Sequence, residues 1–184
     1  YRQAYGFYRL EGGCNRVKVI DNLAAIRTDM EKVCMNCGRK MDDIQTIAVT
    51  KYVSSERTEE AIQAGISHIG ENRLEGIIKK QEQVKGNAKW HFIGSLQTRK
   101  VRDVIGIADY IHSLDRLSLA REIQKRANSA VKCFLQINAS GEESKHGMPP
   151  EEAIPFLNQL AEEGLDKIKI IGLMTMAPFT DDEE

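Results

Sequence analysis

The sequence predicts an α/β fold, a (β/α)8 barrel of the TIM type, on three observations. Short apolar segments alternate with amphipathic segments of helical period along most of the chain, which is typical of βαβ units and a parallel sheet. The apolar segments are short and evenly spaced, as in barrels of about 250 residues. Six such units fit between residues 44 and 184, so we expect a barrel truncated after about six βα units. A doubly wound open sheet is the alternative.

The elements follow in order from the hydrophobic periods. Apolar residues three and four apart predict a first helix over 17–37, and Gly38 supplies its stop signal. Strands are then predicted over 44–50, 66–69, 90–93, 110–112, 131–138 and 168–174. Helices are predicted between them over 55–64, 73–84, 98–105, 117–127 and 150–163. Ser54 or Ser55 caps the second of the helices, and Gly164 ends the last one.

The composition predicts one globular domain and excludes several classes of protein. The 184 residues are 41% hydrophobic and 29% charged, with a formal net charge of −1. This balance predicts no basic surface for nucleic acid or anionic lipid, and no apolar run approaches the roughly 20 residues that span a bilayer. We therefore expect a cytoplasmic protein that binds neither nucleic acid nor membrane. We expect residues 1–16 to be an unassigned leader and residues 17–184 to be the barrel domain, with its C-terminal part missing.

The cysteines predict neither a metal site nor a redox site. Cys34 and Cys37 form a CxxC pair near the end of the first helix, and Cys14 and Cys133 stand alone. A zinc site needs a second pair or histidines at a fixed spacing, whereas the four histidines are scattered. A thioredoxin-like pair would open a helix after a strand. We expect ordinary reduced thiols.

Ligands of parallel α/β folds bind at the carboxyl ends of the strands, where Lys51 is the most informative residue. It follows the first predicted strand and shares parity with Ile47 and Val49, so it points into the barrel if they do. A lysine amine that is neutralised by burial attacks carbonyl groups and forms Schiff bases. The alternative is that Lys51 extends into solvent beside Tyr52.

Other strand ends supply weaker candidates. Asn72 and Arg73 could contact an anionic or aromatic ligand, or Asn72 could cap a helix while Arg73 is solvated. His91 lies in an apolar strand, where a hydrogen-bonded core histidine is the alternative to a functional one. A basic cluster follows the third strand and either holds phosphate or faces water (Arg99, Lys100, Arg102). The motifs GxxxxGK[ST] and GxGxxG are absent, which argues against a nucleotide site.

Five blocks of sequence, in order and in register, resemble the pyridoxal 5′-phosphate (PLP) homeostasis proteins, formerly called proline synthase co-transcribed proteins. The first is AVTKYVS at 48–54, which contains Lys51. The others are GENR at 70–73, WHFIGSLQ at 90–97, the polar loop at 138–147 with Lys145, and GLMTM at 172–176. The resemblance covers roughly residues 17–178.

The resemblance implies a fold similar to the N-terminal domain of bacterial alanine racemase. It implies that PLP is held as a Schiff base on Lys51, with Asn72, His91 and Met174 as further cofactor-binding residues. The family is regarded as a group of carriers or regulators in vitamin B6 homeostasis, without established catalytic turnover. The implied partners are the cofactor itself and PLP-dependent apoenzymes.

The sequence departs from the family pattern in two places. Arg99 stands where the family has Asn, and the Ser-Met-Gly-Met-Ser and Arg-Ile-Gly segments that hold the phosphate do not occur before Glu184. Because a phosphate needs several donors, we expect this chain to retain PLP weakly or not at all. Three alternatives remain: a PLP-dependent racemase or decarboxylase, a cofactor-free aldolase that uses Lys51, and a structural or partner-binding fragment.

Overall fold

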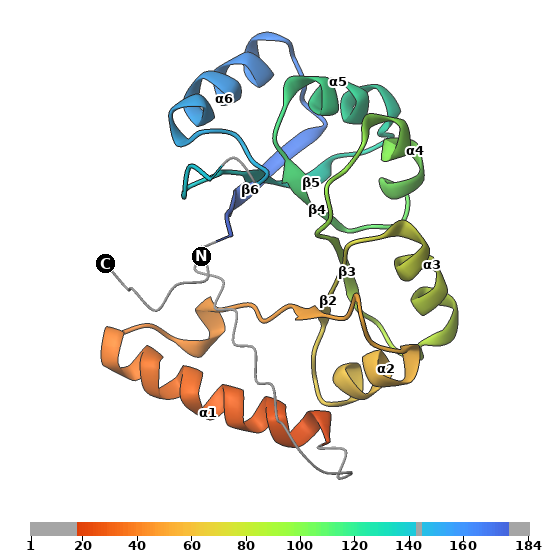
Figure 1. Cartoon of the computed structure of the whole chain (residues 1–184), viewed down its shortest axis with the longest axis vertical. Helices are drawn as coiled ribbons and strands as arrows, with labels where there is room; N and C mark the ends of the chain where they lie inside the picture. Colours follow the sequence, from red (N-terminus) through yellow and green to blue (C-terminus); the bar gives the residue numbers. More distant parts are fainter. Residues whose placement is uncertain (1–17, 143–144, 177–184) are drawn as a thin grey trace.

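The computed structural model describes residues 18–142 and 145–176, which contain one parallel sheet of six strands in the order β1-β2-β3-β4-β5-β6. The sheet curves into an arc, and the helices α2 to α6 cover its outer side (Figure 1). The strands are β1 (Ala48–Val49), β2 (His68–Glu71), β3 (Lys89–Phe92), β4 (Tyr110–Leu114), β5 (Val131–Gln136) and β6 (Ile168–Met174). Because each strand is parallel to its neighbour in the chain, the architecture is the βα alternation that the sequence predicted.

The α-helices lie between these strands, except for the first, which precedes them. They are α1 (Val19–Cys37), α2 (Ser55–Gln63), α3 (Leu74–Gln83), α4 (Val101–Val104), α5 (Leu117–Arg126) and α6 (Ala153–Glu162). Short 3₁₀ turns stand at η1 (Met41–Asp43), η2 (Thr98–Lys100) and η3 (Pro150–Glu152). Within the described ranges, no helix is long and apolar enough to cross a membrane.

The predicted helix ends are confirmed at the positions where a capping side chain or a glycine was expected. Gly38 adopts φ 68° and donates its N–H to the carbonyl of Cys34, so it ends α1 in the left-handed conformation that glycine favours. Ser54 accepts a hydrogen bond from the N–H of Arg57 and caps α2. Gly164 adopts φ 64° just after α6.

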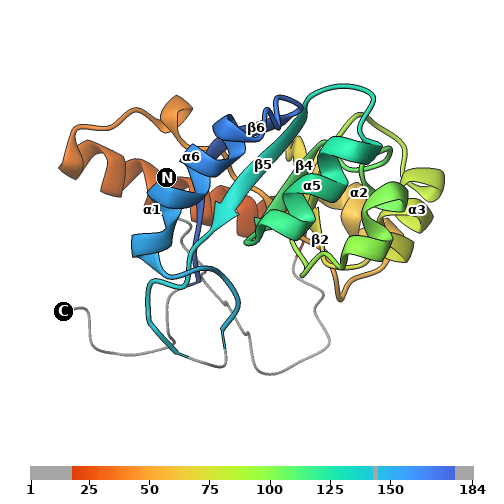
Figure 2. The same cartoon turned by 90° about the horizontal axis from the view of Figure 1, so that it is seen from above.

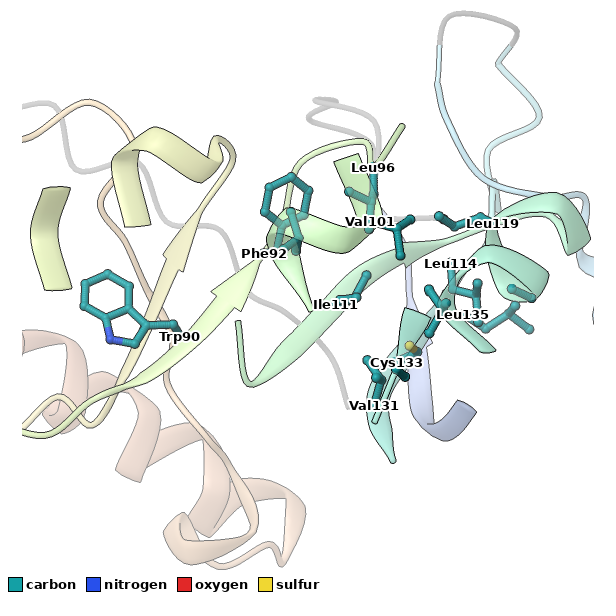
Figure 3. Packing of buried hydrophobic residues seen from close by; sticks show 14 of the residues in the cluster. Trp90, Phe92, Leu96, Val101, Ile111, Leu114, Leu119, Val131, Cys133 and Leu135 are labelled. Carbon is teal, nitrogen blue, oxygen red and sulfur yellow. The ribbon is translucent and has the colours of Figure 1, made fainter. Parts of the chain in front are cut away.

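The hydrophobic core lies between the sheet and its outer helices. Alternate residues of β3, β4 and β5 are buried in this core, among them Trp90, Phe92, Ile111, Cys133 and Leu135 (Figure 3). Leu119 of α5 and Val101 of α4 are fully buried against them. Burial raises the pKa of the Cys133 thiol to about 12, and Cys34, Cys37 and Cys133 form no disulfide within the described residues.

Several predicted boundaries were wrong, among them the helix predicted over 150–163, which begins as the 3₁₀ turn η3, and the strand predicted over 131–138, which ends at Gln136. The strand predicted over 44–50 is shorter than expected: β1 spans only Ala48–Val49, which pair with Ile69 and Gly70 of the short β2. The strand predicted over 66–69 begins at His68, because the N–H of Ile66 bonds to the carbonyl of Ala61 at the end of α2. The helix predicted over 98–105 begins as the 3₁₀ turn η2.

The carboxyl ends of the strands lie on one side of the molecule. Figure 2 shows that the loop between β5 and α6 emerges on this same side. The predicted leader at 1–16 and the acidic residues at 181–184 lie outside the described residues. The side with the strand ends therefore holds every site residue that the sequence predicted at a strand end.

Candidate functional site

Lys51 lies in the turn directly after β1. Thr50 continues the ladder by donating its N–H to the carbonyl of Gly70 at 2.9 Å, and the chain turns at Lys51. Ala48 packs against the core, so alternation places Val49 on the concave side of the sheet. Lys51 is nevertheless exposed, with its Nζ 5.0 Å from the ring centroid of Tyr52. It forms no ion pair with any residue of 18–142 or 145–176.

Of the two interpretations of Lys51 that the sequence left open, burial in the barrel is therefore wrong. Its strand parity was correct, but Val49 on the same face is itself 41% exposed. The concave face is open because no described strand lies opposite β1. Lys51 instead extends into solvent beside Tyr52, as the alternative interpretation predicted.

A buried polar network lies directly below Lys51, and the sequence interpretation missed it. Glu71, the last residue of β2, is 2% exposed, and Lys80 of α3 is 5% exposed. Lys80 Nζ lies 2.5 Å from Glu71 Oε1 and donates to the carbonyl oxygen of Thr50 at 2.5 Å. The Thr50 hydroxyl donates to the same Glu71 oxygen at 2.6 Å. The available signal was the position of Lys80, three residues after the buried Ile77 on one face of α3.

Asn72 follows β2 and lies next to the end of β1. Its side chain is half-buried and makes no hydrogen bond with the described part of the chain, so its amide is free to meet a ligand. The alternative that Asn72 caps a helix was wrong, because the cap position of α3 is Arg73 and has no side-chain bond. Arg73 and the residues of the basic cluster are exposed, as their solvated interpretation expects (Arg73, Arg99, Lys100, Arg102).

His91 belongs to a chain of three histidines on the concave side of the sheet. Its Nε2 lies 2.7 Å from Nδ1 of His68, and its Nδ1 lies 2.7 Å from Nε2 of His112. The register pairs His91 with Gly70 and Gly70 with Val49, which precedes Lys51 by two residues. His91 therefore lies one layer below the level of Lys51, as a hydrogen-bonded core residue.

Burial keeps the three histidines neutral. Desolvation, reinforced by the neighbouring His112 and His68, lowers the pKa of His91 to about 3. Desolvation lowers the pKa of His112 to about 4. It also lowers the pKa of His68, although Asp109 opposes this shift. Each neutral imidazole has one N–H donor and one acceptor nitrogen. This pattern allows both hydrogen bonds along the chain of three rings.

Aromatic rings extend this layer across the sheet. Tyr110 stacks on His91 with centroids 4.3 Å apart and an interplanar angle of 7°. His112 lies 4.2 Å from the ring of Phe134. The rings form a closed floor on the concave side from β2 to β5, beneath the carboxyl ends of these strands.

Met174 ends β6, at the opposite edge of the sheet from Lys51. It pairs with Gln136, and its carbonyl accepts the N–H of Ile137. Next to it, the loop after β5 is held by Asn138, which donates to the carbonyl of Glu142 at 2.9 Å. A hollow of about 150 Å³ lies here, lined by Gln136, Ile137, Asn138, Lys145, His146 and Met176. The structure thus brings Lys51 and Asn72 together and places Met174 across the concave face.

The fold and the strand-end site define an α/β barrel domain of the alanine racemase N-terminal class, whose family matches residues 22–184. The chain belongs to the pyridoxal phosphate homeostasis protein family. It is 37% identical to the pyridoxal phosphate homeostasis protein of Aquifex aeolicus over 168 residues, which are 89% of this chain and 73% of that protein. It is 32% identical to that of Escherichia coli K12 over 165 residues, which are 86% and 70%.

Solved structures agree with this assignment. PipY of Synechococcus elongatus, determined with PLP bound, superposes with a TM-score of 0.74 at 30% identity over 88% of this chain and 71% of that chain. Alanine racemase of Clostridium difficile superposes with a TM-score of 0.63 at 16% identity over 85% and 41%, which shows the shared fold alone. The family and the fold class predicted from the sequence are confirmed.

Proposed function

We propose that this chain binds PLP at Lys51 and serves in intracellular PLP homeostasis without catalytic turnover. The observation that carries the proposal is the exposed amine of Lys51, which has no ion-pair partner in the described structure and stands at the carboxyl end of a strand. The relatives are named as PLP homeostasis proteins, and the similar PipY was solved with PLP bound. These names favour homeostasis over the racemase, decarboxylase and aldolase alternatives.

The residues at the strand ends fit this cofactor. PLP supplies an aldehyde, which a primary amine attacks reversibly with loss of water, and Lys51 provides that amine. Asn72 offers an amide beside it that has no hydrogen-bond partner in the described part of the chain, and the neutral ring of His91 belongs to the layer of rings below. Met174 bounds the opposite edge. We propose these four residues as the cofactor-binding set.

The wider role follows from the same proposal. The chain holds PLP in a protected form, and PLP-dependent apoenzymes in the cytoplasm receive it. We also propose that residues 17–184 act as the barrel domain and that residues 1–16 lie outside it. The family match over 22–184 supports this division.

The test is an absorbance scan of the purified 184-residue chain with and without added PLP, followed by borohydride reduction and peptide mass mapping. We expect a visible band on addition of PLP and a reduced adduct on Lys51. We propose that retention of PLP is weak, so dialysis should then remove most of the unreduced cofactor. Lys51→Ala should abolish both signals, whereas the control Lys125→Ala, at an exposed helical lysine, should keep them. A band without an adduct on Lys51 would contradict the assignment.

A further inference from the structure

The ion pair of Glu71 and Lys80 is the least expected feature near Lys51. Both side chains are almost fully buried, with 2% and 7% exposed. Room for the carboxylate depends on Gly76, where a Cβ would lie 2.7 Å from Glu71 Oε2. Both ends of the pair contact Thr50, the residue immediately before Lys51. The pair therefore connects α3 and β2 to the exact peptide from which the Lys51 turn begins.

Stability alone is a weak explanation for this pair. Removing two charges from water costs several kcal/mol per ion, and apolar replacements of similar volume are often neutral or stabilising. An exposed turn, in contrast, lacks packing that would hold its backbone in one conformation. The Thr50 carbonyl also accepts the N–H of Val53 at 3.0 Å, which closes the turn. The ammonium of Lys80 and the N–H of Val53 thus meet at one carbonyl oxygen.

We propose that Glu71 and Lys80 are positioning residues that fix the Lys51 turn, so that the amine faces the open strand ends. The carboxylate orients the Thr50 hydroxyl and the Lys80 ammonium, and the ammonium holds the Thr50 carbonyl. Neither residue touches the aldehyde. The effect on the reaction of Lys51 with an aldehyde rests on the proposed function, whereas the effect on the turn itself does not.

The central variant replaces the whole pair, Glu71→Leu with Lys80→Met, so that no unpaired charge remains buried. We expect an unfolding midpoint close to that of the unsubstituted chain, since the pair contributes little net stability. We expect the amide of Val53 to exchange its hydrogen at least about tenfold faster, because the turn opens locally. This measurement involves no aldehyde, so it decides the positioning role even if Lys51 does not bind PLP.

The second measurement is the rate of imine formation at Lys51 with pyridoxal, an aldehyde that carries no phosphate. Borohydride traps the imine, and peptide mass mapping locates it on Lys51. The amine displaces the aldehyde oxygen as water, and borohydride supplies the hydride that fixes the bond. A misplaced amine should react roughly 10- to 100-fold more slowly. Thr50→Val removes only the hydroxyl contact, so it should slow imine formation less than the Glu71→Leu, Lys80→Met variant does. Thr50→Ser keeps a hydroxyl and should react at the rate of the unsubstituted chain.

The control pair is Arg121 and Glu163, an exposed ion pair at 2.7 Å that joins α5 to the end of α6. Arg121→Gln with Glu163→Gln should leave both measurements unchanged. Unchanged exchange of the Val53 amide in the central variant would overturn the proposal. Equal slowing by the control pair would also overturn it. Absence of any Lys51 adduct in the unsubstituted chain would instead contradict the proposed function and leave the exchange result to stand alone.

Discussion

At the residue scale, the three-histidine chain makes stability depend on pH. His91 and His112 have pKa values of about 3 and about 4 in the folded chain, against about 6.5 for an unperturbed histidine. The unfolded state therefore binds more protons between these values, and stability falls as pH falls below about 6.5. The slope is about 1.4 kcal/mol per pH unit for each histidine that titrates.

Urea unfolding between pH 7.5 and 4.5, roughly the range over which unfolded histidine gains its proton, measures this effect. We expect the free energy of unfolding to decline steadily below pH 6.5. His91→Gln should cost roughly 1–3 kcal/mol at neutral pH, because it breaks buried hydrogen bonds, and it should flatten the decline. The exposed His146→Gln serves as the control and should leave the slope unchanged. A decline that is equally steep in His91→Gln would show that other groups cause it.

Also at the residue scale, Lys51 shows what the alternation of side chains along a strand can predict and what it cannot. Parity identified the face of β1 to which Lys51 belongs, but not whether that face is covered. Exposure depends on the residues opposite, and these are not neighbours in the sequence. Because Lys51 is exposed, neutralisation by burial no longer accounts for a reactive amine. The proposal that Lys51 meets the aldehyde rests instead on the accessibility of its amine and on its place in the family motif.

At the element scale, the ends of β2 and β3 approach so closely that only glycine fits between them. A Cβ on Gly94 would lie 2.3 Å from the backbone carbonyl oxygen of Asn72. Because backbone must move to relieve this contact, Gly94→Ala should destabilise the chain by roughly 1–3 kcal/mol. It should also displace Asn72 from its place beside Lys51.

Thermal unfolding of Gly94→Ala, compared with Gly106→Ala, tests this prediction. A Cβ on Gly106 would have no neighbouring heavy atom within 4 Å, so replacing Gly106 with alanine should be neutral or slightly stabilising. We expect a clear drop in the midpoint for Gly94→Ala only. An equal change in the two variants would mean that the close approach carries no cost.

The elements themselves were largely predictable from sequence. The helices and strands recur at the expected places because each is amphipathic or apolar over its own length. The errors cluster at boundaries, as at 44–50 and at Ile66. There, hydrogen-bond partners elsewhere in the fold decide where a strand begins, and a local pattern does not contain them.

At the scale of the whole molecule, the two outer strands of the described sheet present open edges. β1 pairs only with β2, and β6 only with β5. On β6, Leu173 is 61% exposed. Unpaired parallel edges with apolar side chains favour association between chains. We expect the 184-residue chain to associate as its concentration rises.

Light scattering with size-exclusion chromatography tests this prediction. Leu173→Lys places a charge beside the β6 edge and should shift the chain toward the monomer. Ile154→Lys is the matched control, because Ile154 is 65% exposed on α6, a helix rather than a strand edge. A monomer at all concentrations, or equal shifts in the two variants, would contradict a role for the edge.

The sequence by itself determined the βα alternation, the position of Lys51 at a strand end and the family, because these depend on local periodicity and on short motifs. Only the tertiary structure decided which polar groups meet. Glu71 and Lys80 are partners because α3 packs on β2, and Thr50 joins them because β1 lies beside β2. His68, His91 and His112 form one chain because the register places them diagonally across three neighbouring strands, with Gly70 and Tyr110 as the direct partners of His91. Such contacts join residues that are far apart in sequence, so they follow from packing and register rather than from composition or period.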